Sequence, residues 1–191
     1  MSLTVFILAV LGSVIYASFF EWTLHRFVMH RPLLKFRYPY EAHALTHHRI
    51  FKADDSYHLK EDSDKWTIPM AWWNGPVLVI LSASPFLLVG WRAWLISMGV
   101  IGLYYGAYEY LHWCMHLPKG RRVERTWFFF RLNGHHLLHH RYPNRNFNVV
   151  FPAADLLLGT LLLRSKFRFA QARGPAVPNV QPFEDIFSAS A

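Results

Sequence analysis

The stretch Asn133-Gly134-His135-His136-Leu137-Leu138-His139-His140-Arg141 carries four histidines in six residues. A related stretch, His43-Ala44-Leu45-Thr46-His47-His48-Arg49, occurs upstream, and both read H-x3-H-H-R. Neutral imidazole is a ligand for iron, zinc, copper and nickel. The first hypothesis is therefore a metal site built mainly from imidazole.

The other histidines support this hypothesis, because eleven of the twelve fall in four short groups. The groups are His25 and His30; His43, His47 and His48; His112 and His116; and His135, His136, His139 and His140. One metal ion takes about four to six ligands, so ten or eleven histidines suit two ions. His58, Glu21 and Glu109 are additional candidate ligands. The two glutamates can instead orient a ligand by accepting a histidine N–H, or be ordinary carboxylates at helix ends.

Helical spacing also favours ligation, because residues i and i+4 lie on one face of a helix. The pairs with this spacing are His43 with His47, His112 with His116, and His135 with His139; His136 and His139 share a face at i+3. The adjacent His48 and His140 point about 100° away, toward a second metal. His25 and His30 are five residues apart, so they fit one site only if the helix bulges or ends near Arg31-Pro32.

The composition favours a membrane protein. Hydrophobic residues make up 53% of the chain and charged residues 17%, against about 25% charged in an average soluble domain. Three uncharged or nearly uncharged segments, 1–20, 66–91 and 93–108, are predicted to span a membrane. A cleaved signal peptide is the alternative for the first, but no basic region precedes it. The apolar segment 149–163 is short and contains Asp155, so we expect an interfacial or buried helix there.

The charge distribution predicts the orientation. Both histidine-bearing regions flank the predicted hairpin of spans 66–91 and 93–108, and of 20 Lys and Arg only Arg92 lies on its far side. The positive-inside rule places the histidine face in the cytoplasm, at a bacterial inner membrane or the endoplasmic reticulum. Basic loops of this kind explain the net charge of +8 better than nucleic-acid binding does, and we expect no nucleic-acid partner. We expect one domain over 1–173 and an extended tail over 174–191.

The two halves of the chain resemble each other. Glu21 to Pro32 ends the first span and Glu109 to Pro118 ends the third, and both carry an acidic residue, a histidine, Met-His and then a proline. An H-x3-H-H-R stretch follows each. The repeat predicts two similar half-sites that face one another, each made from a membrane helix and a short amphipathic helix.

The four histidine groups resemble the histidine boxes of the fatty acid hydroxylase/sterol desaturase superfamily. The matching pattern is His25-x4-His30, His43-x3-His47-His48, His112-x3-His116 and His136-x2-His139-His140. The segment from Arg141-Tyr142-Pro143 to Gly159-Thr160 resembles the family as well. The resemblance covers roughly residues 15–165. His135 leaves the spacing of the last box open between x3 and x2.

The resemblance implies an all-α integral membrane protein of three to four transmembrane helices, with a cytoplasmic histidine-rich helical cap that holds a di-metal site. It implies two iron ions, which zinc can replace in purified material, and hydroxylation or desaturation of a lipid C–H bond with dioxygen. No nucleotide-binding or haem-attachment motif occurs. Electrons would therefore come from an external ferredoxin or cytochrome-b-type carrier with its reductase, steered by basic residues such as Arg121, Arg122 and Arg125.

Several functions remain open at this point. A lipid hydroxylase is the leading interpretation, and a desaturase or a carotenoid or sterol oxidase on the same scaffold is the alternative. A membrane metal-binding or transport protein is a candidate of another class, although transporters usually place ionisable ligands inside their spans. An apolar substrate would enter from the bilayer, and candidate tunnel residues are Trp72, Trp73, Tyr104, Tyr105 and Tyr108.

Overall fold

The computed structural model describes residues 2–163, which form helices and no strand. The α-helices are α1 (Leu3–Leu24), α2 (Tyr38–Tyr40), α3 (His48–Ile50), α4 (Asn74–Ala83), α5 (Trp91–His116), α6 (Trp127–Arg141) and α7 (Ala153–Leu157). Two π-helices cover His25–Met29 and Glu41–His47, and 3-10 helices cover Asp62–Thr67, Ser84–Leu88 and Val123–Arg125. The all-α prediction is confirmed for these residues. The predicted tail, 174–191, lies outside them, and the domain limits stay a prediction.

Helix α1 is apolar around its whole circumference. Ser2 caps it by accepting a hydrogen bond from the Val5 amide at 3.3 Å, and most of its first three turns are exposed. With the π-helix that follows, it forms a continuous helix over Leu3–Met29, which is long and apolar enough to cross a membrane. Within residues 2–163 no other helix meets this criterion, so the full number of spans stays a prediction.

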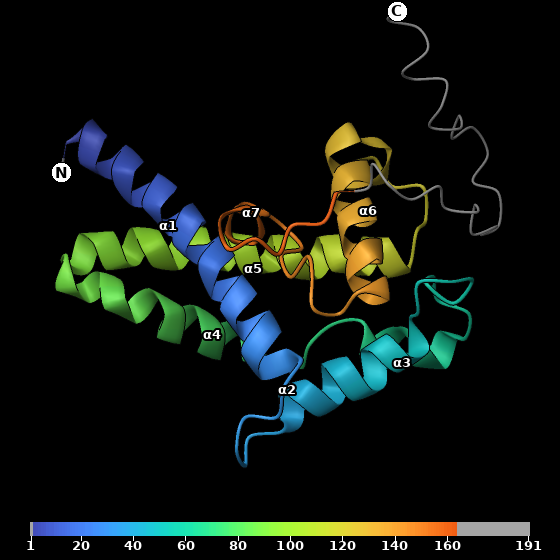
Figure 1. Ribbon diagram of the computed structural model, residues 1–191. Helices are drawn as coiled ribbons and strands as arrows, with labels where there is room; N and C mark the ends of the chain where they lie inside the picture. The colour runs from blue at the N-terminus through green and yellow to red at the C-terminus, as the bar shows by residue number, and fades with distance from the viewer. Residues whose placement is uncertain (1, 164–191) are drawn as a thin grey trace, which may run out of the picture.

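Helices α4 and α5 form an antiparallel hairpin, and α1 crosses it (Figure 1). The predicted span 66–91 is wrong in its bounds, because continuous helix exists only over Asn74–Leu88. Pro85 stands where α4 changes into a 3-10 helix, since proline cannot donate the backbone hydrogen bond that an α-helix requires. The third predicted span is confirmed as part of a helix, because α5 continues unbroken to His116.

Small polar residues lie where α1 crosses α5. The hydroxyls of Ser13 and Ser97 are 2.8 Å apart, and both side chains are fully buried. Small residues let helix backbones approach closely, and a buried hydroxyl pair satisfies both groups where no water is present. Farther along the same helices, Ala17 packs with Ile101 and with Ala83 of α4.

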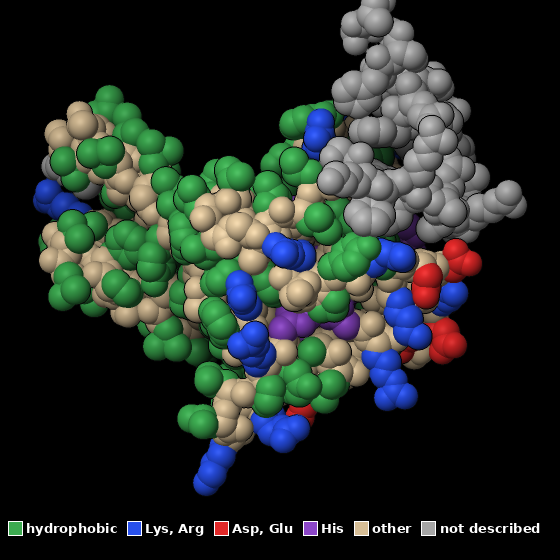
Figure 2. Space-filling view, viewed as in Figure 1, with side chains coloured by type: hydrophobic (Ala, Val, Ile, Leu, Met, Phe, Trp, Pro, Cys, Tyr) green, Lys and Arg blue, Asp and Glu red, His purple; other side chains and the backbone are tan. Residues whose placement is uncertain are grey.

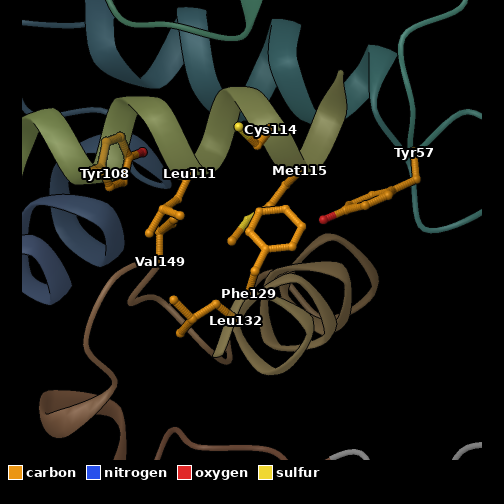
Figure 3. Close-up of a cluster of buried hydrophobic side chains, with 8 residues drawn as sticks. All are labelled: Tyr57, Tyr108, Leu111, Cys114, Met115, Phe129, Leu132 and Val149. Atoms are coloured by element: carbon orange, nitrogen blue, oxygen red, sulfur yellow. The ribbon is translucent and has the colours of Figure 1, made fainter. Parts of the chain in front are cut away.

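The polar half of the molecule has its own core between α5 and α6. Figure 3 shows Met115 of α5 directed at Phe129 and Leu132 of α6, with Tyr57 reaching in from the segment after α3. The Tyr57 hydroxyl donates to Asn133 Oδ1 at 2.8 Å. This packing fixes α6 against the end of α5, where the histidines of both helices lie.

The segment after α6 returns to α1 and is tied to it by polar contacts. Ser18 Oγ donates to the Phe151 carbonyl at 2.6 Å, and the Trp22 indole donates to Thr160 Oγ1 at 2.8 Å. The expected helix over 149–163 is only the five residues of α7. Pro152 precedes it, and Gly159 at φ +70° turns the chain away after it.

Candidate metal centre

The two π-helices bring histidines five residues apart onto one side of the chain. In a π-helix residue i+5 donates to the carbonyl of residue i. The His30 amide donates to the His25 carbonyl at 3.1 Å, and the His48 amide donates to the His43 carbonyl. The bulge required for His25 and His30 to share a site is therefore present. The same distortion places His43 with His48.

The histidines form two groups of five, and within each group the potential ligand atoms all lie within 4.8 Å of one another. The first histidine group is His25, His30, His43, His48 and His139. The second histidine group is His47, His112, His116, His136 and His140. Each group takes four histidines from one half of the chain and one from the other. The groups are adjacent, with the rings of His48 and His140 stacked at 4.2 Å between centroids.

The two halves of the repeat thus each contribute one histidine to the group that the other half mainly forms. His47 leaves its own half to join the second group, and His139 of α6 joins the first. Helix α6 is α-helical throughout, and its His136 and His140 at i+4 both belong to the second group, whereas His139 belongs to the first. His43 and His48 are five residues apart, one more than His136 and His140, and the π-helix over Glu41–His47 accommodates the additional residue. The expectations that His43 shares a site with His47, and His139 with His135 or His136, are therefore wrong. In the last box, His136-x2-His139-His140 supplies the ligands of the two groups, so x2 is the spacing that applies.

Backbone carbonyls fix the tautomers of five ring systems. Each of these rings donates from Nδ1 to a backbone carbonyl. The pairs are His25 with Phe147, His47 with Thr67, His116 with Tyr57, His139 with Arg145 and His140 with Phe51. A carbonyl only accepts, so Nδ1 carries the proton in each neutral ring. The Nε2 atom of each of these rings is therefore unprotonated, and its lone pair points inward, as a metal ligand requires.

The inward Nε2 atoms have the spacing of ligands around one ion. Neighbouring Nε2 atoms are 2.9 to 3.1 Å apart in the first group and 3.0 to 3.2 Å apart in the second. Two nitrogens bound at about 2.1 Å and at right angles are about 3.0 Å apart. Hydrogen bonds alone do not satisfy the set: His116 and His140 both direct a lone pair at His136 Nε2, which carries at most one proton. A cation in the second group resolves this conflict, and the first group has the same Nε2 spacing, so the donor set fits two metal ions.

Burial keeps these imidazoles neutral, as ligation requires. Burial lowers the pKa of His47 to about 3 and that of His30 to about 4. Burial also lowers the pKa of His136, His139 and His140 well below the usual value, and neighbouring histidines lower it further. A proton therefore does not compete with a metal ion at these nitrogens near pH 7.

His135 lies outside both histidine groups, although it stands beside His136 in the sequence. Its Nε2 is 3.1 Å from Asp155 Oδ2, and both side chains are buried. Asp155 also accepts hydrogen bonds from the amides of Phe147 and Asn148, at 2.9 and 2.7 Å. The pair therefore anchors the segment whose Phe147 carbonyl orients His25.

The remaining candidate ligands also lie outside the two groups. Glu21 accepts from the Tyr104 hydroxyl at 2.7 Å and from the Val149 amide at 2.6 Å. Glu109 accepts from the Tyr105 hydroxyl at 2.7 Å. His58 packs against the Tyr57 ring. The partners of both carboxylates among the described residues are tyrosines, an asparagine and backbone amides, which fix helices to neighbouring segments.

A cavity between α1, α4 and α5 reaches the first histidine group. Its empty space is about 620 Å³ including its open mouth, and apolar side chains form most of its lining. His25 lies in its wall with Glu21, Tyr104, Tyr105 and Tyr108. The three tyrosines proposed as tunnel residues thus line the cavity. Trp72 and Trp73 do not, and Trp72 is 86% exposed.

The model of the family described as "Fatty acid hydroxylase" matches residues 10–160. The chain belongs to the fatty acid hydroxylase family. Fatty acid hydroxylase family members are membrane-associated oxidoreductases, and the two histidine groups fit a metal-dependent family. No curated protein and no solved structure gives a match.

All ten histidines of the two groups were predicted as ligands from sequence spacing. The residues that orient them were not, because a backbone carbonyl has no sequence signature. Asp155 and Thr160 belong to the segment that carries part of the family resemblance. The resemblance marks this segment but does not reveal the hydrogen bonds that these residues make to Phe147, Asn148 and each other.

Proposed function

We propose that this protein is a membrane di-iron enzyme that hydroxylates a C–H bond of a fatty acyl or related lipid. The observation that carries the proposal is the apolar cavity between α1, α4 and α5, which reaches His25 of a five-histidine group. An acyl chain fits a space of this lining. The two irons would supply activation of dioxygen, a reaction that side chains cannot perform alone.

The residues of the chain would bind and orient the reactants. The apolar walls would hold the acyl chain and exclude water from the reacting carbon. The carbonyls of Phe147 and Arg145 accept from Nδ1 of His25 and His139, so both rings present Nε2 in one fixed direction. Ten histidines and no cysteine line the two groups, which suits iron or zinc bound by imidazole.

The membrane arrangement is part of the proposal. Three to four helices would cross the bilayer, with α1 and the α4–α5 hairpin among them, and the histidine groups would lie at the cytoplasmic edge. The apolar surface of α1 and the concentration of Lys and Arg in the histidine half support this orientation.

The electrons would come from an acidic ferredoxin or cytochrome-b-type carrier and its reductase. Arg122 and Arg125 are exposed and suit such a partner. Arg121 suits it less, because its guanidinium pairs with Glu124 and donates to the Leu117 carbonyl at 2.8 Å.

Lipid analysis tests the reaction directly. Cells that express the protein would be compared with cells that express His139→Ala or His136→Ala, using mass spectrometry of extracted lipids with and without oxygen. We expect an oxygen-dependent product that is heavier by one oxygen atom and absent from both variants. A product lighter by two hydrogens would assign a desaturase instead. Unchanged lipids together with metal flux into vesicles would refute an enzyme.

A further inference from the structure

A second pocket reaches the first histidine group from the polar part of the molecule. It is lined by Arg26, His30 and Arg31 from the end of the α1 segment, and by Arg141, Asn144 and Phe147 from the end of α6 and beyond. Its empty space is about 800 Å³ including its open mouth. Figure 2 shows histidine side chains reaching the surface of the molecule, with Lys and Arg side chains on several sides.

Three guanidinium groups in this pocket have no acidic partner in the described chain. None of the ion pairs within residues 2–163 includes Arg26, Arg31 or Arg141. Metal ions in the adjacent histidine group would add further positive charge. The pocket therefore attracts an anion and does not serve an internal salt bridge.

Aromatic rings hold the guanidinium of Arg26 in place. Its Cζ lies 4.9 Å from the centre of the Trp22 ring and 5.7 Å from that of Phe147. Arg31 is similarly placed, 5.6 Å from the centre of the Phe27 ring. A planar guanidinium that is stacked in this way keeps its N–H donors directed sideways, and these donors match the two oxygens of a carboxylate or phosphate.

We propose that this pocket binds the oxyanion of an amphiphile, a carboxylate or a phosphate, beside His30. The arginines supply the donors, and the Phe147 ring, which lies near Arg26 and lines the pocket, offers apolar surface to the adjoining part of the ligand. The pocket is concave, which suits one small charged group. Its importance for catalysis rests on the proposed function: an anion held here lies beside the histidine group that the acyl-chain cavity also reaches.

Two sources share this chemistry, the carboxylate of a fatty acid and the phosphate of a membrane lipid. The metal-loaded protein in phosphatidylcholine nanodiscs would be titrated with radiolabelled palmitate and with hexadecanol, which has the same chain length and no charge. For Arg26→Gln/Arg141→Gln we expect the Kd of palmitate to rise about tenfold or more, and that of hexadecanol to stay unchanged. In a second arm, nanodiscs with added phosphatidylglycerol would be assayed for retained lipid by native mass spectrometry. Loss of bound phosphatidylglycerol in the variant would identify the phosphate as the ligand.

Arg131→Gln is the matched control. Arg131 lies on the same helix as Arg141 and also stacks on an aromatic ring, 5.0 Å from the centre of Trp127, but it lies outside the pocket. Metal content and elution volume in gel filtration would verify folding. If the double variant fails to fold, Arg31→Gln would replace it, because Arg31 is exposed. The proposal would be overturned if wild type and variant bound palmitate equally and also retained phosphatidylglycerol equally. A variant that loses only the binding of an acidic protein would overturn it as well.

The binding assays do not depend on turnover. If the pocket binds anions but no oxidised lipid forms, the proposed function fails and the anion site stands. If lipid is oxidised but the arginine substitutions change neither palmitate binding nor phosphatidylglycerol retention, only the anion site fails.

Discussion

At the scale of single residues, His47 and His139 each join the group formed mainly by the other half of the chain. They distinguish this arrangement from two independent metal sites, one in each half. His139 lies between His136 and His140 in the sequence, yet those two belong to the second histidine group and His139 to the first. Its Nε2 lies 3.0 Å from that of His30 and 3.1 Å from that of His48, and its Nδ1 donates to the Arg145 carbonyl at 2.8 Å. One side chain thus links α6 to the ligands of the N-terminal half.

The crossing makes the effect of single substitutions specific to one ion. His139→Ala removes a ligand from the first histidine group and leaves all five ligands of the second. We expect the metal content to fall from about two ions per chain to about one, as measured by elemental analysis of purified protein. His58→Ala is the control, because His58 lies outside both groups. Loss of both ions from a folded His139→Ala protein would show that the two groups bind metal as a single unit.

At the scale of elements, the segment between α6 and α7 works as a strap over the first histidine group. Its carbonyls accept from His25 and His139, and Asp155 at the start of α7 holds it by accepting from the Phe147 and Asn148 amides. Asp155 also accepts from Thr160 Oγ1 at 2.6 Å. Four donors around one buried carboxylate leave no room for an amide N–H₂.

Asp155→Asn would therefore loosen the strap without changing the size of the side chain. We expect a loss of about 1–3 kcal/mol in the free energy of unfolding, because a buried donor loses its acceptor. We also expect weaker metal binding in the first group and unchanged binding in the second, measured by chelator competition on the purified protein. Asp54→Asn, at an exposed carboxylate that accepts only from Ser56 among the described residues, is the control. A destabilised variant with both metal affinities intact would limit Asp155 to a structural role.

At the scale of the whole molecule, one polar half concentrates ten neutral imidazoles in its interior. Burial lowers the pKa of His47 to about 3 and that of His30 to about 4, whereas the ordinary value in an unfolded chain is about 6.5. Below about pH 6.5 the unfolded chain therefore binds more protons than the folded one, so stability falls as the pH falls.

This proton linkage predicts acid sensitivity. The unfolding temperature of the protein in detergent should be constant from about pH 8 to 7 and drop progressively from about pH 6.5 to 5. Removal of metal by a chelator should lower the whole curve, since bound metal stabilises only the folded state. Burial also lowers the pKa of His58, so His58→Gln, which leaves the ten histidines of the two groups in place, should lessen the drop only slightly. An unfolding temperature that stays constant down to pH 5 would contradict the burial of neutral histidines.

The sequence by itself indicated the candidate ligands and an apolar segment long enough to cross a membrane. Imidazole spacing is a local property, and so is the uncharged run of α1, so both are readable without coordinates. The tertiary structure decided how the histidines are divided. The division depends on π-helices at His25–Met29 and Glu41–His47, which place His25 with His30 and His43 with His48. It also decided that His135 lies with Asp155 and that Arg26 and Arg141 share a pocket, because these residues are brought together only when the segment after α6 folds back onto α1.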